Sequence, residues 1–252
     1  VVNVSKIDVK GARVAKEGVI PLLTRPNLFW ESSKSLAVEP GFFQMTRPLF
    51  VNVPRNERRA VPIEIADLVP EKCGFVFLQV ATGTDSYARA FLQVTRLGVT
   101  AKFSADNNAV WVTDLKTGQS IPEASIEVRD DKNSVLWAGK TDVHGQAVPP
   151  GWKSLVLKSR NEWTKPRQWI FAGLGQDTVL ISSDWGTGIG PYRFGISYDW
   201  NAVPESLAGD VFSERGIYRA GETVHIKGIL RRKESGQWRL PAEKTVECEV
   251  QD

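Results

Sequence analysis

Few side chains of this 252-residue sequence have the types and spacing that metal chemistry requires. Its histidines are His144 and His225, and its cysteines are Cys73 and Cys248. Structural zinc sites take four such ligands, grouped in pairs a few residues apart, and these four residues are scattered along the chain. Two cysteines permit at most one disulfide bridge. We predict that both are unbridged, because Cys248 alternates with valines and faces a core, and we predict no metal site.

Nucleophilic and phosphate chemistry are equally poorly supported. Ser182–Asp184 contains two hydroxyls and a carboxylate, but no nucleophile-elbow motif links them to either histidine. The glycine-rich stretch at 186–190 lacks the lysine of a phosphate-binding loop, and a proline follows it directly. The adjacent acids Asp130–Asp131 suit a turn, not the separated carboxylates of a glycosidase. We therefore predict no catalytic residue, no cofactor-binding residue and no enzyme activity.

The composition is that of a globular chain with ample material for cores. Apolar residues make up 42%, including nine Trp and eleven Phe. The 32 basic and 29 acidic residues give a net charge of +3, too weak and dispersed to indicate nucleic-acid binding. No stretch approaches the roughly 18 apolar residues of a membrane span. The sequence starts at Val1 without a charged-then-apolar signal segment, so we expect a processed or excised piece.

Short apolar runs separated by turn residues indicate an all-β chain. The runs at 74–80 and 87–94, joined by a short Gly/Asp/Ser loop, predict a hairpin. Further strands are predicted at 48–53, 61–65, 109–113, 125–129, 135–137, 155–157, 169–172 and 179–181. The alternation at 125–129 predicts that Ile126 and Val128 face inward. Seven or so short strands at the spacing seen after residue 97 are typical of a β-sandwich. No sustained 3.6-residue periodicity occurs, so helix should be scarce.

Three units are predicted: 1–96, 97–206 and 207–252. The first junction has no Pro- or Gly-rich linker, which predicts closely abutted domains. The long stretch before the second junction is rich in aromatic residues, namely Trp185, Tyr192, Phe194, Tyr198 and Trp200. They indicate either a sugar-binding surface or a loop folded against the neighbouring domain, and we favour the loop.

The most informative stretch is 210–232. Val211 and Phe212 suit a strand. The residues at 219–222 indicate a tight turn, because Gly221 tolerates the positive φ that most residues avoid. From Val224 the chain alternates, with Ile226 and Leu230 on one face and polar residues on the other, as in a half-buried strand.

The sequence SERGIYRAGETVHIKGILR at 213–231 resembles the segment that opens one macroglobulin-like domain in alpha-2-macroglobulins, above all bacterial ones. The usual pattern has Arg, Gly, an apolar residue and Tyr, then Arg-Pro-Gly-Glu and an alternating strand. Ala220 stands here where proline is usual, which should relax the turn and leave the fold unchanged. The resemblance is weaker over 95–205 and faint before that.

The resemblance implies three tandem macroglobulin-like modules, which are fibronectin-III-like or immunoglobulin-like antiparallel β-sandwiches, the last one truncated. It implies a scaffold segment of a bacterial alpha-2-macroglobulin, a broad-spectrum endopeptidase inhibitor that traps attacking proteases. Its partners would be the remainder of the parent and, through the parent's bait region, target proteases. The parent would be periplasmic, with any membrane association through a lipid anchor outside this chain.

The family's reactive thioester requires Cys-x-Glu-Gln. The sequence Cys248-Glu249-Val250-Gln251 has its acid one place too early, and Cys73 is followed by Gly-Phe-Val, so we expect no thioester in this chain. The alternative is a carbohydrate- or protein-binding module of a surface adhesin. The last unit offers about three strands, predicted at 211–218, 223–232 and 244–251, which is about half the number in a sandwich. We therefore predict that its apolar face is covered by something outside this sequence.

Overall fold

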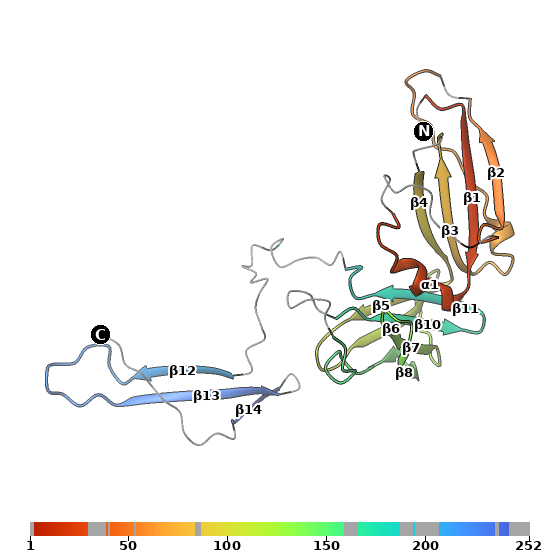
Figure 1. The fold of residues 1–252 in the computed structure, drawn as a ribbon. Coiled ribbons are helices and arrows are strands. Elements are labelled where there is room, and N and C mark those ends of the chain that lie inside the picture. The colour runs from red at the N-terminus through yellow and green to blue at the C-terminus, as the bar shows by residue number, and fades with distance from the viewer. Residues whose placement is uncertain are drawn as a thin grey trace. The chain divides into compact units, whose positions relative to one another are not determined.

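The computed structural model describes residues 3–29, 39, 41–52, 54–83, 87–158, 166–186, 194, 207–234 and 237–241. The chain divides into two compact units, 1–187 and 188–252 (Figure 1). Strands in antiparallel sheets dominate the described residues, which contain one α-helix of eight residues. The chain is therefore all-β, with several antiparallel sheets.

The first module of the larger unit is a four-stranded antiparallel sheet in the order β2-β1-β3-β4. The hairpin predicted from its last two apolar runs is confirmed. Its elements are β1 (Lys6–Val14), α1 (Lys16–Leu23), β2 (Met45–Phe50), the short helix η1 (Ala66–Leu68), β3 (Gly74–Ala81) and β4 (Tyr87–Val94). Pro48 lies in β2, an edge strand, where a missing backbone N–H is tolerated.

One face of this sheet is covered by irregular chain. Ile7, Val9 and Val76 are buried there, and the partly buried Val61 and Ile63 pack against them. The strand predicted at 61–65 is wrong, because these residues pair with no described strand although their side chains alternate in burial.

The second module is a sandwich of a four-stranded sheet, in the order β11-β10-β7-β8, and a three-stranded sheet, in the order β5-β6-β9. Its strands are β5 (Leu97–Lys102), β6 (Ala109–Asp114), β7 (Ser125–Arg129), β8 (Val135–Lys140), β9 (Gln146–Ala147), β10 (Trp169–Leu174) and β11 (Asp177–Ser182). The strand predicted at 155–157 is wrong. Leu155 N–H donates to the carbonyl of Gly151 at 3.1 Å, and Val156 has a φ of 52°, so the segment is a turn.

Strand β10 is buried on both faces, which explains its unbroken apolar sequence Trp-Ile-Phe-Ala. Ile170 and Ala172 belong to the core of the sandwich. Trp169 and Phe171 point the other way and join a second cluster, with Phe75 of the first module. The prediction of closely abutted domains is confirmed, because one apolar cluster spans both modules.

The smaller unit contains a three-stranded antiparallel sheet in the order β12-β13-β14. Its strands are β12 (Leu207–Ser213), β13 (Ile226–Glu234) and β14 (Gln237–Arg239). The strand predicted at 211–218 ends at Ser213, because the signature sequence after it forms a loop. The further strand predicted at 244–251 lies outside the described residues.

The apolar face of this small sheet is exposed. Ile226 and Leu230 alternate along β13 as predicted, and the register places Leu207 and Val211 of β12 on the same face. Val211 is 58% exposed and Ile226 is 54% exposed. That something outside this sequence covers this face stays a prediction.

Candidate functional site

Of the residues considered for metal or thiol chemistry, Cys73 belongs to the first module of the larger unit, His144 to its second module, and His225 to the smaller unit. His144 lies in a turn, where its backbone N–H donates to Asp142 Oδ1 at 2.8 Å. Cys73 is free, and burial, reinforced by the charge of Asp177, raises the pKa of its thiol. Among the residues that the structure describes, no group of three or more His, Cys, Asp or Glu is placed to hold a metal ion. Cys248 and most of the loop at 186–190 lie outside those residues.

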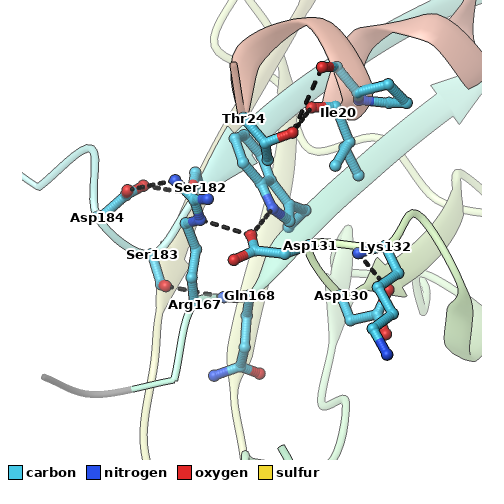
Figure 2. A network of polar contacts seen from close by, with 12 residues as sticks. Ile20, Thr24, Asp130, Asp131, Lys132, Arg167, Gln168, Ser182, Ser183 and Asp184 are labelled. Atoms are coloured by element: carbon cyan, nitrogen blue, oxygen red, sulfur yellow. Dashed lines mark hydrogen bonds and ion pairs between the residues drawn. The ribbon is translucent and has the colours of Figure 1, made fainter. Parts of the chain in front are cut away.

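The strongest constellation of polar side chains is centred on Arg167, which immediately precedes β10. Its Nε donates to Asp131 Oδ1 at 2.6 Å, and its Nη1 donates to Asp184 Oδ2 at 3.1 Å. Figure 2 shows this guanidinium close to both carboxylates, which come from the β7–β8 turn and from the end of β11. The Arg167 side chain is 14% exposed, so its guanidinium is largely shielded from water.

Aromatic rings and hydroxyls complete this cluster. The Arg167 guanidinium lies 4.9 Å from the ring centroid of Trp169, whose Nε1 donates to Asp131 at 2.9 Å. Ser182 donates its hydroxyl proton to Asp184. Although burial alone would lower it, the hydrogen bonds and charges of the two aspartates raise the pKa of Arg167 above its ordinary value. The guanidinium is therefore permanently charged.

This arrangement holds strands in place and activates no nucleophile. Asp131 and Asp184 both accept hydrogen bonds from Arg167. Neither histidine takes part in the described contacts of Ser182. Ser183 Oγ accepts a hydrogen bond from the Gln168 backbone at 3.0 Å, which ties the start of β10 to the end of β11. The hydrolytic arrangement considered for Ser182–Asp184 therefore has no base among the described residues.

Sequence reasoning missed the role of Asp131. It treated the Asp130–Asp131 pair as turn residues, and Asp130 does accept hydrogen bonds from the backbone N–H groups of Lys132 and Ser134 at 2.9 and 2.8 Å. Asp131 faces the other way, toward a residue 36 positions later in the chain. Only its place next to a buried strand could have suggested a separate role.

A second polar cluster lies where helix α1 meets the second module. Lys16 Nζ donates to Glu127 Oε1 at 2.8 Å, and the Arg129 guanidinium pairs with the other oxygen of that carboxylate at 2.5 Å. Lys16 Nζ and Arg129 Cζ lie 5.2 and 5.0 Å from the ring centroid of Phe171. A buried ring is thus contacted by two cations that share one carboxylate, a favourable cation–π arrangement.

The Glu127 carboxylate should make the junction sensitive to acid. Burial would raise its pKa, but the hydrogen bonds and charges of Lys16 and Arg129 hold the pKa below its usual value. Because the pKa of Glu127 is lower in the folded state than in the unfolded state, its ionised carboxylate stabilises the fold. This stabilisation is fully present above the unfolded-state pKa, near 4.5, and is lost as the pH falls through the folded-state pKa. We expect Glu127→Gln to lower the free energy of unfolding by about 1–3 kcal/mol at pH 7.

Urea denaturation of both proteins at pH 7 and at pH 3 measures this effect, and the difference should shrink at the lower pH. Glu123→Gln is the control, because its ion pair with Lys140 is exposed, with side chains 71% and 64% accessible, and exposed pairs contribute little. A Glu127→Gln penalty that is independent of pH would contradict the assignment.

The aromatic stretch examined as a sugar-binding surface is partly described. Trp185 packs edge-to-face on Trp169, with ring centroids 5.8 Å apart. It borders an open pocket of about 560 Å³, also lined by Arg89 and Phe91. Arg89 donates to Gln79 Oε1 at 2.9 Å and to the Leu28 carbonyl at 3.3 Å, so this cation serves the fold. Tyr192, Tyr198 and Trp200 lie outside the described residues.

The signature loop of the small unit is held together by its own side chains. Arg215 lies 4.8 Å from the ring centroid of Tyr218 and pairs with Glu222 at 3.5 Å. The Tyr218 hydroxyl accepts a hydrogen bond from the Arg215 backbone at 3.0 Å. Gly221 has a φ of 89°, as expected for this turn. The Arg, Tyr, Gly and Glu of the pattern are therefore structural residues.

No helix in the described residues is long and apolar enough to cross a membrane. The clusters around Arg167, Glu127 and Arg215 stabilise a strand end, a module junction and a loop, respectively.

The second module matches a family model. Residues 94–201 match the bacterial alpha-2-macroglobulin MG3 domain. An alpha-2-macroglobulin of Xylella fastidiosa is 25% identical over 254 aligned residues, covering 92% of this chain. An alpha-2-macroglobulin homolog of Nostoc sp. is 21% identical over 204 residues, covering 72%. The aligned regions are only 14% and 11% of these relatives' lengths, so the chain spans a small part of each.

Solved structures share the fold. Native Escherichia coli alpha-2-macroglobulin spanning domains NIE-MG1 matches with a TM-score of 0.56 at 16% identity, covering 73% of this chain and 86% of that one. Trypsin-activated alpha-2-macroglobulin from the same organism matches with a TM-score of 0.59 at 19% identity, covering 92% of this chain and 15% of that one. The chain is therefore similar in sequence to bacterial alpha-2-macroglobulins, with the family-model match confined to residues 94–201, and it shares their fold.

Proposed function

We propose that the chain is a structural scaffold segment of a bacterial alpha-2-macroglobulin that traps attacking proteases, and that it has no enzyme activity of its own. The observation that carries the proposal is the use made of its polar side chains. Arg167, Glu127 and Arg215 each make contacts that fix a strand end, a junction or a loop. Such contacts serve the rigidity of the fold, as expected for a segment whose role is structural.

The exposed apolar face of the small sheet supports the proposal that the chain is part of a larger protein. Leaving Val211 and Ile226 in water forgoes about 1.5–3 kcal/mol each relative to burial. The remainder of the parent is thus the principal partner in this proposal, and target proteases are met through a bait region elsewhere.

The test is to titrate the isolated chain against trypsin and follow cleavage of a large protein substrate. We expect no protection at any stoichiometry, because trapping requires the parent's bait region and enclosure by the whole molecule. The parent protein is the positive comparison in the same assay. Stoichiometric protection by the isolated chain would overturn the scaffold proposal.

We further propose that the parent resides in the periplasm, possessing a lipid anchor outside this chain. What supports this location is the similarity to bacterial alpha-2-macroglobulins. Fractionation of cells producing the parent, with detection through an epitope on this segment, should place it with periplasmic or membrane material. Recovery in the cytoplasmic fraction would contradict the proposal.

A further inference from the structure

The edge strand β11 of the second module meets a side chain of the first module. Leu180 N–H donates to Gln93 Oε1 at 2.7 Å, and Gln93 Nε2 donates to the Leu180 carbonyl at 3.0 Å. Gln93 lies on β4, and β11 is the outermost strand of its own sheet. The carboxamide therefore offers the same donor and acceptor that one residue of a neighbouring strand would offer.

Water cannot easily replace this pair of hydrogen bonds, because Leu180 is 1% exposed. A buried backbone group left without a partner pays its full desolvation cost. The carboxamide satisfies both groups of Leu180 at once, and only one placement of the first module against the second does so.

A second tie lies close by on the same strand. The Arg96 backbone N–H donates to Asp177 Oδ2 at 2.8 Å, and Asp177 is the first residue of β11. Only Thr95 and Arg96 separate β4 from β5. The crossing between modules is therefore short and attached to the edge strand at its start.

Polar ties also lie on the α1 side of the apolar cluster. Lys16 pairs with Glu127, and Asn133 Nδ2 donates to the Glu17 carbonyl at 2.9 Å. Between the two groups of ties, Phe75 packs edge-to-face on Phe171, with ring centroids 6.1 Å apart. Apolar burial is non-directional and permits one surface to slide over another. The hydrogen bonds on both sides of the apolar cluster fix the orientation of one module relative to the other.

We propose that Gln93 acts as a substitute strand residue that locks the two modules into one rigid body of fixed orientation. Gln93 is a positioning residue, and the apolar cluster supplies the adhesion that it orients. This inference concerns the mechanics of the two modules and does not depend on the proposed scaffold function, since its test requires neither protease nor parent.

The test measures the distance distribution between spin labels on the two modules. Labels are attached at Glu57→Cys and Lys116→Cys, both exposed sites, in the full chain with both native cysteines replaced by serine. Gln93→Met keeps the length of the side chain and removes both hydrogen bonds. We expect the distance distribution of Gln93→Met to be about twofold broader than that of the labelled chain with Gln93 intact. The reason is that abutting domains move when directional contacts between them are lost.

Two further variants complete the design. Gln93→Glu keeps an acceptor for the Leu180 N–H but places a carboxylate against its carbonyl, and it should also broaden the distribution. Gln119→Met changes an exposed glutamine of the second module and should leave the width unchanged. If Gln93→Met does not fold, Gln93→Glu decides the question. Unchanged widths in the folded Gln93 variants would overturn the proposal, even if their unfolding midpoints fall.

Discussion

Phe171→Ala should lower the free energy of unfolding of the larger unit by about 3–5 kcal/mol, the range for truncating a buried aromatic residue. The Phe171 side chain is 1% exposed and joins the cluster shared by both modules. Its removal leaves a cavity and withdraws the ring that Lys16 and Arg129 contact. Urea denaturation followed by tryptophan fluorescence measures the change.

The matched control is Leu174→Ala on the same strand. Leu174 is 47% exposed, so its truncation should cost less than about 1 kcal/mol. Because Phe171 faces the first module and not the sandwich core, its loss should also weaken the coupling between modules, seen as separate unfolding transitions in calorimetry. A Phe171→Ala penalty no larger than that of Leu174→Ala would show that the junction is not a tight core.

Arg167→Leu should destabilise the chain by about 2–3 kcal/mol, because it leaves two carboxylates without the cation that they share. The expected loss is below that of a fully enclosed ion pair, since the Asp184 side chain is 50% exposed. Arg167→Lys should fall between the wild type and Arg167→Leu, because an ammonium cannot reproduce the planar fork that reaches both acids and stacks on Trp169.

The comparison for Arg167 is Lys140→Leu, which removes an exposed partner of Glu123 and should change stability by less than about 1 kcal/mol. Both variants are compared by their urea midpoints under the same salt. Equal midpoints for Arg167→Leu and Lys140→Leu would mean that the Arg167 cluster adds no more than a surface ion pair.

The two predictions share a structural basis. Phe171 and Arg167 lie on or beside β10, the strand that belongs at once to the sandwich core and to the module junction. A single strand buried on both faces therefore controls both the second module and its attachment to the first. The larger unit gains rigidity from such sharing, because neither module can shift without disturbing the other.

The sequence by itself determined the elements with local signals. The period of two at 125–129 placed Ile126 and Val128 in the core, where both are fully buried. The apolar runs of β3 and β4 indicated their hairpin, and the turn at Gly221 followed from the need for a positive φ. These features depend on neighbouring residues, so the sequence contains what decides them. The resemblance to alpha-2-macroglobulins at 213–231 was likewise visible in the local sequence, and the curated relatives are alpha-2-macroglobulins.

Tertiary structure alone decided which apolar segments pair and which polar groups meet. Val61 and Ile63 alternate like a strand, but they pair with no described strand and instead pack against the apolar cluster on one face of the first sheet. β1 was not predicted although Lys-Ile-Asp-Val-Lys alternates, and its place in the first sheet is decided by its pairing with β2 and β3. Asp131 reaches Arg167, and Gln93 reaches Leu180, across 36 and 87 positions. Such contacts depend on how the modules pack, and local sequence patterns do not encode that.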